Sequence, residues 1–109
     1  MSDITNILHI TNQVEKINSK NLENAQEILS DLITDVNKFT YIKLEKVDAV
    51  YENHPAKDNL FVCKITVLGS HKLSFKSETE GKDFLVIVRA AAKEISEYLH
   101  KENNKRAQH

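Results

Sequence analysis

The spacing of apolar residues changes along the chain, and each change predicts a new element. Residues 7–11, ILHIT, are rich in residues that favour β structure, and apolar and polar side chains alternate from Leu8 onward. This pattern predicts a first strand with Leu8 and Ile10 on its inner side. From residue 21 to residue 39 the period becomes helical, and polar residues just before it can cap a helix. The apolar arc of this predicted helix consists of Leu22, Ala25, Ile28, Leu29, Leu32, Ile33, Val36 and Phe39. Its outer side carries Glu23, Glu27, Asp31 and Asp35.

Alternation returns in residues 40–52, TYIKLEKVDAVYE, but the inward phase changes after Leu44 and resumes at Val47. One extra residue near Glu45 and Lys46 would reconcile the two halves, so we predict a β-bulge there. The loop 53–59 contains the only proline and ends this strand.

Two further strands are predicted at residues 60–68, LFVCKITVL, and 71–77, HKLSFKS. Gly69 and Ser70 between them are interpreted as a two-residue hairpin turn. The inward side chains of the two strands are predicted to be Phe61, Cys63, Ile65, Val67, Leu73 and Phe75.

Residues 80–101, EGKDFLVIVRAAAKEISEYLHK, predict a second helix whose turns begin around Asp83. Its apolar positions share one face, and they are Phe84, Ile87, Val88, Ala91, Ala92, Ile95, Tyr98 and Leu99. Residues 102–109 show no hydrophobic period, and we expect them to fray.

The resulting order is β-α-β-β-β-α, an α+β fold. A right-handed crossover through the first helix makes the first two strands parallel, and the later hairpins are antiparallel. Since each helix has one apolar face, both are expected on one side of a four-stranded mixed sheet. The chain of 109 residues is expected to be a single domain, 1–109, with its core at about 7–101.

A basic stripe on the second helix is the main candidate site. Lys82, Arg89, Lys93 and His100 fall within about 40° of one another around a helix, and Lys101, Lys105 and Arg106 follow nearby. The formal net charge is -1, so this stripe is a local arrangement. It suits a phosphate backbone, although such a stripe is also the ordinary solvated face of an amphipathic helix. The open sheet face offers a second set of cations: Lys43, Lys64, Lys72 and Lys76.

The sheet lysines have two interpretations, contact with RNA or protection of the sheet against aggregation. The acids of the first helix are interpreted as a solvent-exposed polar face, and the alternative is that they contact a basic protein.

Composition favours a non-catalytic cytoplasmic protein. One cysteine excludes an internal disulfide and fits a reducing compartment, and no apolar run is long enough to span a membrane. Nothing at the start of the sequence reads as a secretion signal. Cys63 lies on the apolar side of its strand and is expected to be a buried core thiol. The five histidines lack metal-ligand spacing, so we expect no metal, cofactor or small-molecule substrate.

From Ile7 to Lys105 the sequence resembles the short ribosome hibernation-promoting factors, also called ribosome-associated inhibitor or sigma-modulation proteins. The resemblance lies in the element order, the length, the EGKDF motif with Glu80, Gly81 and Asp83, and the basic end YLHKENNK. It implies a double-stranded-RNA-binding-like fold. It also implies a protein that occupies the decoding channel of the small ribosomal subunit, contacts 16S rRNA and ribosomal proteins, and silences idle ribosomes in stationary phase or stress. Off the ribosome, such a protein is expected to be a monomer.

Several positions depart from the family pattern. Phe84 stands where the family usually has Met, Leu85 where it has Tyr, and Arg89 where it has an acid. Family members spread basic residues over both helices, whereas the first helix here is acidic and would be repelled by phosphate. Two functions therefore stay open: a ribosome-binding regulator that uses the second helix, or a diverged non-catalytic interaction domain that binds a protein partner.

Overall fold

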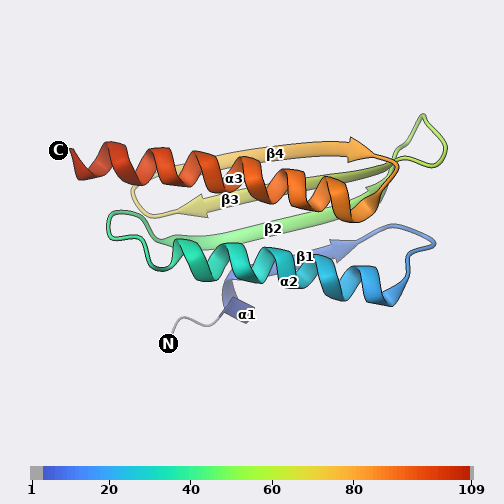
Figure 1. Ribbon diagram of the computed structural model, residues 1–109, viewed down its shortest axis with the longest axis horizontal. Coiled ribbons are helices and arrows are strands. Elements are labelled where there is room, and N and C mark those ends of the chain that lie inside the picture. Colours follow the sequence, from blue (N-terminus) through green and yellow to red (C-terminus); the bar gives the residue numbers. More distant parts are fainter. Residues whose placement is uncertain (1–3, 109) are drawn as a thin grey trace.

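The computed structural model describes residues 4–108 and contains the six predicted elements with one short addition (Figure 1). The elements are α1 (Ile4–Ile7), β1 (Leu8–Asn12), α2 (Ser19–Val36), β2 (Leu44–Asn53), β3 (Phe61–Gly69), β4 (Leu73–Gly81) and α3 (Phe84–Ala107). The addition is α1, which takes up Ile7, so the first strand starts and ends one residue later than predicted.

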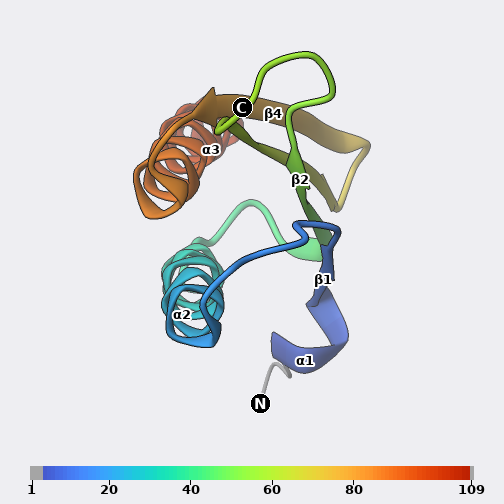
Figure 2. The same cartoon turned by 90° about the vertical axis from the view of Figure 1, so that its right-hand side faces the viewer.

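The four strands form one sheet in the order β1-β2-β3-β4. β1 and β2 are parallel, and the other two pairs are antiparallel. Figure 2 shows α2 and α3 side by side on the same face of this sheet. The predicted α+β fold, with a mixed sheet and both helices on one face, is confirmed.

The β-bulge in β2 is confirmed as well. The pairing of β2 with β3 shifts register between Leu44 and Lys46. Because of this extra residue, Leu44 and Val47 are both buried although they stand three positions apart, an odd number that regular alternation would place on opposite faces.

The core lies between the helices and the sheet. α2 begins after Asn18, whose side-chain Oδ1 accepts a hydrogen bond from Lys20 N at 2.7 Å. The fully buried large side chains come from both layers, and they are Leu29, Ile33, Val36, Ile42, Val47, Tyr51, Cys63, Ile65, Val67, Val88, Ile95 and Leu99. Phe61 and Phe75, both predicted to point inward, are only partly buried and lie at the margins of this core.

The turn between β3 and β4 differs from the prediction. Gly69 belongs to β3 and pairs with Leu73, and the turn is centred on His71 and Lys72, with φ of 55° and 64°. Leu73 N donates to Ser70 O at 3.2 Å across it. Positive φ at both central positions is the signature of a type I′ turn. Gly69 is needed for space, because a Cβ there would lie 2.5 Å from Lys43 O.

The last strand and the last helix are both longer than predicted. β4 continues to Gly81, so Glu80 and Gly81 belong to the strand, and α3 starts at Phe84 with Asp83 as its N-cap. The expected fraying of residues 102–107 is wrong, because they form the last turns of α3. These turns are held by contacts such as that of Asn103 Oδ1, which accepts a hydrogen bond from Tyr41 N at 3.0 Å. His109 lies outside the described residues.

Candidate nucleic-acid interface

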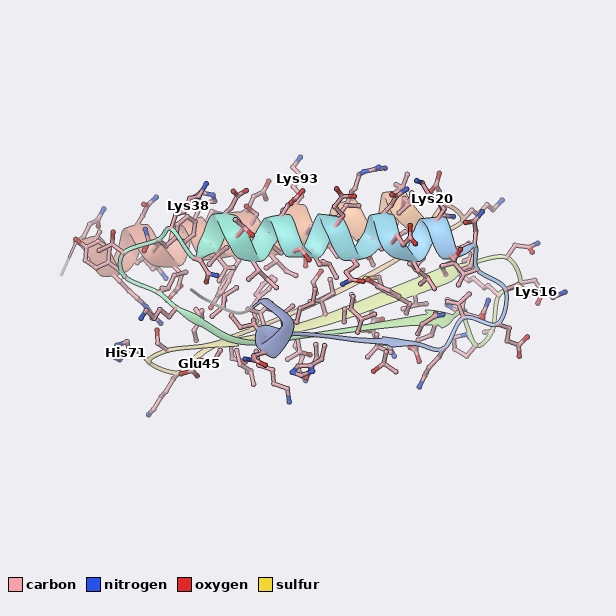
Figure 3. All side chains as sticks on the ribbon, turned by 90° about the horizontal axis from the view of Figure 1, so that it is seen from below. Lys16, Lys20, Lys38, Glu45, His71 and Lys93 are labelled. Atoms are coloured by element: carbon pink, nitrogen blue, oxygen red, sulfur yellow. The ribbon has the colours of Figure 1, made fainter. Side chains whose placement is uncertain are left out.

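Arg89 and Lys93 form an exposed basic pair on the outer side of α3. The helix begins where Asp83 Oδ1 accepts a hydrogen bond from Val86 N at 3.3 Å, and its apolar arc then packs on the sheet and α2. This packing turns Arg89 and Lys93, one helical turn or about 6 Å apart, toward solvent. Figure 3 shows Lys93 projecting from the helix layer away from the sheet. Among the residues that the structure describes, neither side chain forms an ion pair.

The two ends of the predicted stripe differ from its centre. Lys82 is exposed but lies in the turn before α3, so the helical stripe starts at Arg89. His100 is exposed at the far end, and its ring packs against Phe39 with a centroid distance of 4.7 Å. One face of this imidazole is therefore used for packing, which leaves Arg89 and Lys93 as the two fully exposed members of the predicted stripe within the helix.

The C-terminal cations separate into two kinds. Lys101 and Lys105 are exposed, on a side of α3 roughly 120° or more round the helix from Arg89. Arg106 is half-buried, and its Nη1 and Nη2 donate to Ser70 O and His71 O at 3.2 and 3.4 Å. The guanidinium binds the turn between β3 and β4, so fewer of its donors are open to RNA than those of Arg89, and its role as an RNA ligand stays a prediction.

The lysines of the sheet side are less available than expected. Lys64 Nζ lies 2.7 Å from Glu52 Oε1, and this hydrogen bond, together with the charges of Glu52 and Glu78, raises the pKa of Lys64. The strand register also places Lys64 of β3 directly opposite Glu78 of the neighbouring strand β4. On the same face Lys46 pairs with Asp48 at 3.4 Å. The open face therefore carries mixed charge, which weakens its case as a phosphate-binding surface.

The other three sheet-side lysines occupy different settings. Lys43 lies in the loop before β2, where its backbone N donates to Ser70 Oγ at 3.1 Å. Lys72 is at the centre of the strained turn, and Lys76 is exposed in β4 opposite Thr66. The three are thus spread from the end of the sheet to its edge, and they form no continuous track.

The helix layer itself is divided by charge. Glu23, Glu27, Asp31 and Asp35 are all exposed on α2, as predicted, and Asp35 makes a long contact of 3.9 Å with Lys38. α3 lies alongside (Figure 2) and carries five Lys and Arg against three Glu, of which Glu94 and Glu97 are exposed. A polyanion would be attracted to α3 and repelled by α2, so this surface selects an orientation.

Cys63 is fully buried, as predicted, and burial raises the pKa of its thiol to about 12, which suppresses the reactive thiolate. Within residues 4–108 no group of three or more potential metal ligands comes together. None of the helices described there has the length and apolar character that crossing a bilayer requires.

Sequence reasoning missed the acids of the sheet. Glu52, Glu78 and Glu80 share the outward phase of the lysines, and β4 carries two of them because it extends through SETEG. The alternating phase of Lys76, Glu78 and Glu80 was the available signal.

Solved structures with the same fold are known. The N-terminal domain of Protein Y from Thermus thermophilus matches with a TM-score of 0.65 and 9% identity, over 87% of this chain and 97% of the other. A ribosomal subunit interface protein from Coxiella burnetii matches with a TM-score of 0.64 and 10% identity, over 89% of this chain and 97% of the other. No family model and no curated protein matches the sequence. At this identity the likeness establishes a shared fold, which is the fold that the resemblance to the hibernation-promoting factors implied.

Proposed function

We propose that this chain, as a single domain, is a ribosome-associated hibernation factor. It binds the small subunit in the decoding channel, where messenger and transfer RNA would lie, and blocks translation by idle ribosomes in the cytoplasm. The observation that carries this proposal is the fold shared over nearly the whole chain with a ribosomal subunit interface protein and with Protein Y. The sequence motif at Glu80, Gly81 and Asp83 supports it.

The RNA-facing surface in this proposal is α3. Arg89 and Lys93 supply unpaired, exposed cations at its centre, and Lys82 extends the surface at its start. Lys101 and Lys105 lie on another side of the last turns of α3, where they would contact a strand that bends round the end of the helix. Cations placed along a helix can neutralise successive phosphates of 16S rRNA and release their counterions. The factor acts by occupying the channel, so it needs no catalytic group, cofactor or small-molecule substrate, and it is a monomer off the ribosome.

A protein partner is the alternative function. It is favoured by the acidic outer side of α2 and by the open sheet face, whose cations and acids largely pair with one another. Ribosomal proteins are one source of such a partner, so this contact could also accompany RNA binding.

Sedimentation with purified ribosomal subunits tests the proposal. We expect the protein in the small-subunit fraction at low salt, and we expect messenger or initiator transfer RNA to displace it. Affinity should fall steeply as salt rises, because phosphate contacts release counterions. Recovery of the protein only in ribosome-free fractions at low salt would contradict the proposal. Binding that hardly responds to salt would favour the protein partner.

A further inference from the structure

A pocket of about 440 Å³ lies at the end of the molecule where both long helices begin. α2 and α3 run in the same direction (Figure 1), so the loop before α2 and the turn before α3 meet at this end. Lys16 and Ile17 come from the first segment, Lys82 and Phe84 from the second, and Phe61 from the start of β3. Residues far apart in sequence thus form one concave surface.

The floor of the pocket is apolar and packs on the core. Ile17 and Phe61 are partly buried, so each keeps surface open to solvent. The ring of Phe61 is held by Phe84, with a centroid distance of 5.9 Å and an interplanar angle of 76°. Phe84 is itself only 3% exposed and packs edge-on against Tyr51. Phe61 is therefore a supported aromatic surface, which is what a stacking ligand needs.

The rim of the pocket is basic. Lys16 and Lys82 are both exposed, and neither forms an ion pair with any other described residue. Figure 3 shows Lys16 extending from this end of the molecule. The lining also includes Asp83, whose carboxylate is engaged as the N-cap of α3. Two exposed ammonium groups beside an apolar floor suit a ligand that joins a flat ring to phosphate.

We infer that this pocket seats one unpaired nucleotide of an RNA strand that lies along α3. Its base stacks on Phe61 beside Ile17, and its flanking phosphates contact Lys16 and Lys82. This inference rests on the proposed function and adds a base-binding position to it. The stacking contact with Phe61 is expected to tolerate any base, because every base has a flat face. Asn18 and Asn21 also line the pocket, and their side-chain amides are the groups that can contact a base edge.

Continuity with the basic helix favours RNA over a free nucleotide. Phe84 in the pocket is five residues before Arg89, about 7.5 Å along the helix axis, and Lys93 follows about 6 Å further. Such steps are comparable to the spacing of phosphates along an extended strand. Phe84 faces the core, roughly 140° round the helix from Arg89, so a strand on Arg89 and Lys93 would reach the pocket by way of Lys82, which lines it just before α3. A mononucleotide would have only the two rim lysines to hold its phosphate.

The test uses a fluorescein-labelled, unstructured RNA of about ten nucleotides, within the usual site size of single-strand binders. Fluorescence anisotropy measures its affinity for the full chain at several salt concentrations. Phe61→Leu removes the stacking face and is expected to weaken binding about 5- to 30-fold with an unchanged salt slope. Lys16→Gln with Lys82→Gln should weaken binding and reduce the slope by about 1.4, which is 0.7 for each lost single-strand contact.

Matched controls separate the pocket from general effects on folding or charge. Phe75→Leu truncates another partly buried phenylalanine of the sheet, and Lys57→Gln removes an exposed lysine from the β2–β3 loop. Both should bind the RNA within about twofold of the parent. In the NMR spectrum of the parent complex, Phe61 ring protons should show contacts to base protons. This readout does not depend on the stability of any variant.

The inference is overturned if the RNA does not bind, if Phe61→Leu binds no worse than Phe75→Leu, or if no contact of a base with Phe61 is seen. Uridine monophosphate that binds as tightly as the RNA would overturn the assignment to an RNA strand. Sedimentation with ribosomes is scored separately. If Phe61→Leu binds ribosomes normally and the parent shows no contact of a base with Phe61, the pocket is rejected as a nucleotide site. The proposed function is then unaffected.

Discussion

Arg106 Nη1 donates to Ser70 O at 3.2 Å and so fastens the last turns of α3 to the turn between β3 and β4. The same guanidinium also reaches His71 O, and its Nε lies 3.8 Å from Glu102 Oε1 one helical turn earlier. Ser70 in turn bonds through its backbone N to Lys43 O at 2.9 Å. The last turns of α3 are thus a structural part of the fold.

Truncation of Arg106 should therefore reduce stability. Arg106→Ala removes two hydrogen bonds from a charged donor, and we expect a loss of about 1 to 3 kcal/mol in the free energy of unfolding measured with urea. The neighbouring Lys105→Ala, which changes an exposed side chain, should change it by less than about 0.5 kcal/mol. Equal stability of the two variants would mean that the last turns of α3 are not docked in solution.

His54 has a defined role in the β2–β3 loop. Its Nδ1 accepts hydrogen bonds from Ala56 N and Lys57 N, both at 3.0 Å, and its Nε2 lies 3.2 Å from Glu80 Oε2. Since Nδ1 is an acceptor, the neutral ring must carry its proton on Nε2, and imidazole ¹⁵N shifts should show this tautomer.

Substitutions of His54 should follow the acceptor role. In His54→Asn the side-chain oxygen can replace Nδ1 in bonding the two backbone N–H groups, so stability should be largely kept. His54→Ala leaves these donors to solvent and should cost about 1 kcal/mol in the free energy of unfolding. A ring protonated on Nδ1 at neutral pH, or an Asn variant as unstable as the Ala variant, would contradict this role.

The turn at His71 and Lys72 can be improved. Both residues have positive φ, which a side chain with a Cβ tolerates poorly, whereas Asn-Gly is the preferred pair for this type of turn. His71→Asn with Lys72→Gly should raise the free energy of unfolding by about 1 kcal/mol. Lys76→Gly, in the regular part of β4, should lower it instead. A double variant less stable than the parent would contradict the type I′ geometry.

Cys63 should make stability depend on alkaline pH. Burial raises the pKa of its thiol to about 12, while in the unfolded chain the thiol loses its proton at about 8.5. Above the unfolded value the native state holds one more proton, so stability falls as pH rises toward the folded value, by up to about 1.4 kcal/mol per pH unit. Below the unfolded value this contribution is fully present.

Urea unfolding between about pH 8.5 and 10 isolates this effect, because the buried Tyr51, whose pKa is also raised, has an unfolded value near 10. Cys63→Ala should be less stable at neutral pH, since it leaves a small cavity, but its stability should vary less with pH in this window. Parallel pH profiles of the parent and the variant would show that Cys63 is not buried as described.

The sequence was informative where the spacing of apolar residues along one element decides the structure. The phase change between Leu44 and Val47 predicted the bulge, and the apolar arc of residues 84–99 predicted which side of α3 faces the core. Both are properties of neighbours along one element, so pattern analysis reaches them.

The sequence was uninformative where segments that are distant along the chain meet. Gly69 was read as a turn residue because its actual constraint, the close approach of Lys43 O, comes from another segment. Likewise, the role of Arg106 depends on the loop at Ser70 lying under the end of α3, and the pairing of Lys64 with Glu52 depends on strand register. The exposed pair Arg89 and Lys93 was predicted correctly because only the helical period places it. The binding roles of the predicted site residues remain predictions.

The most direct test of α3 as the RNA-facing surface is charge reversal at Arg89 and Lys93, measured by sedimentation with small ribosomal subunits over a range of salt. Arg89→Glu with Lys93→Glu should keep the fold, because both side chains are exposed, and should weaken binding at least about tenfold with a salt slope lower by about 2. Lys72→Glu with Lys76→Glu, the matched reversal on the sheet side, should do less. If the α3 variant binds as well as the parent at near-physiological salt, the account is wrong, and a larger loss from the sheet pair would place the RNA on the sheet instead.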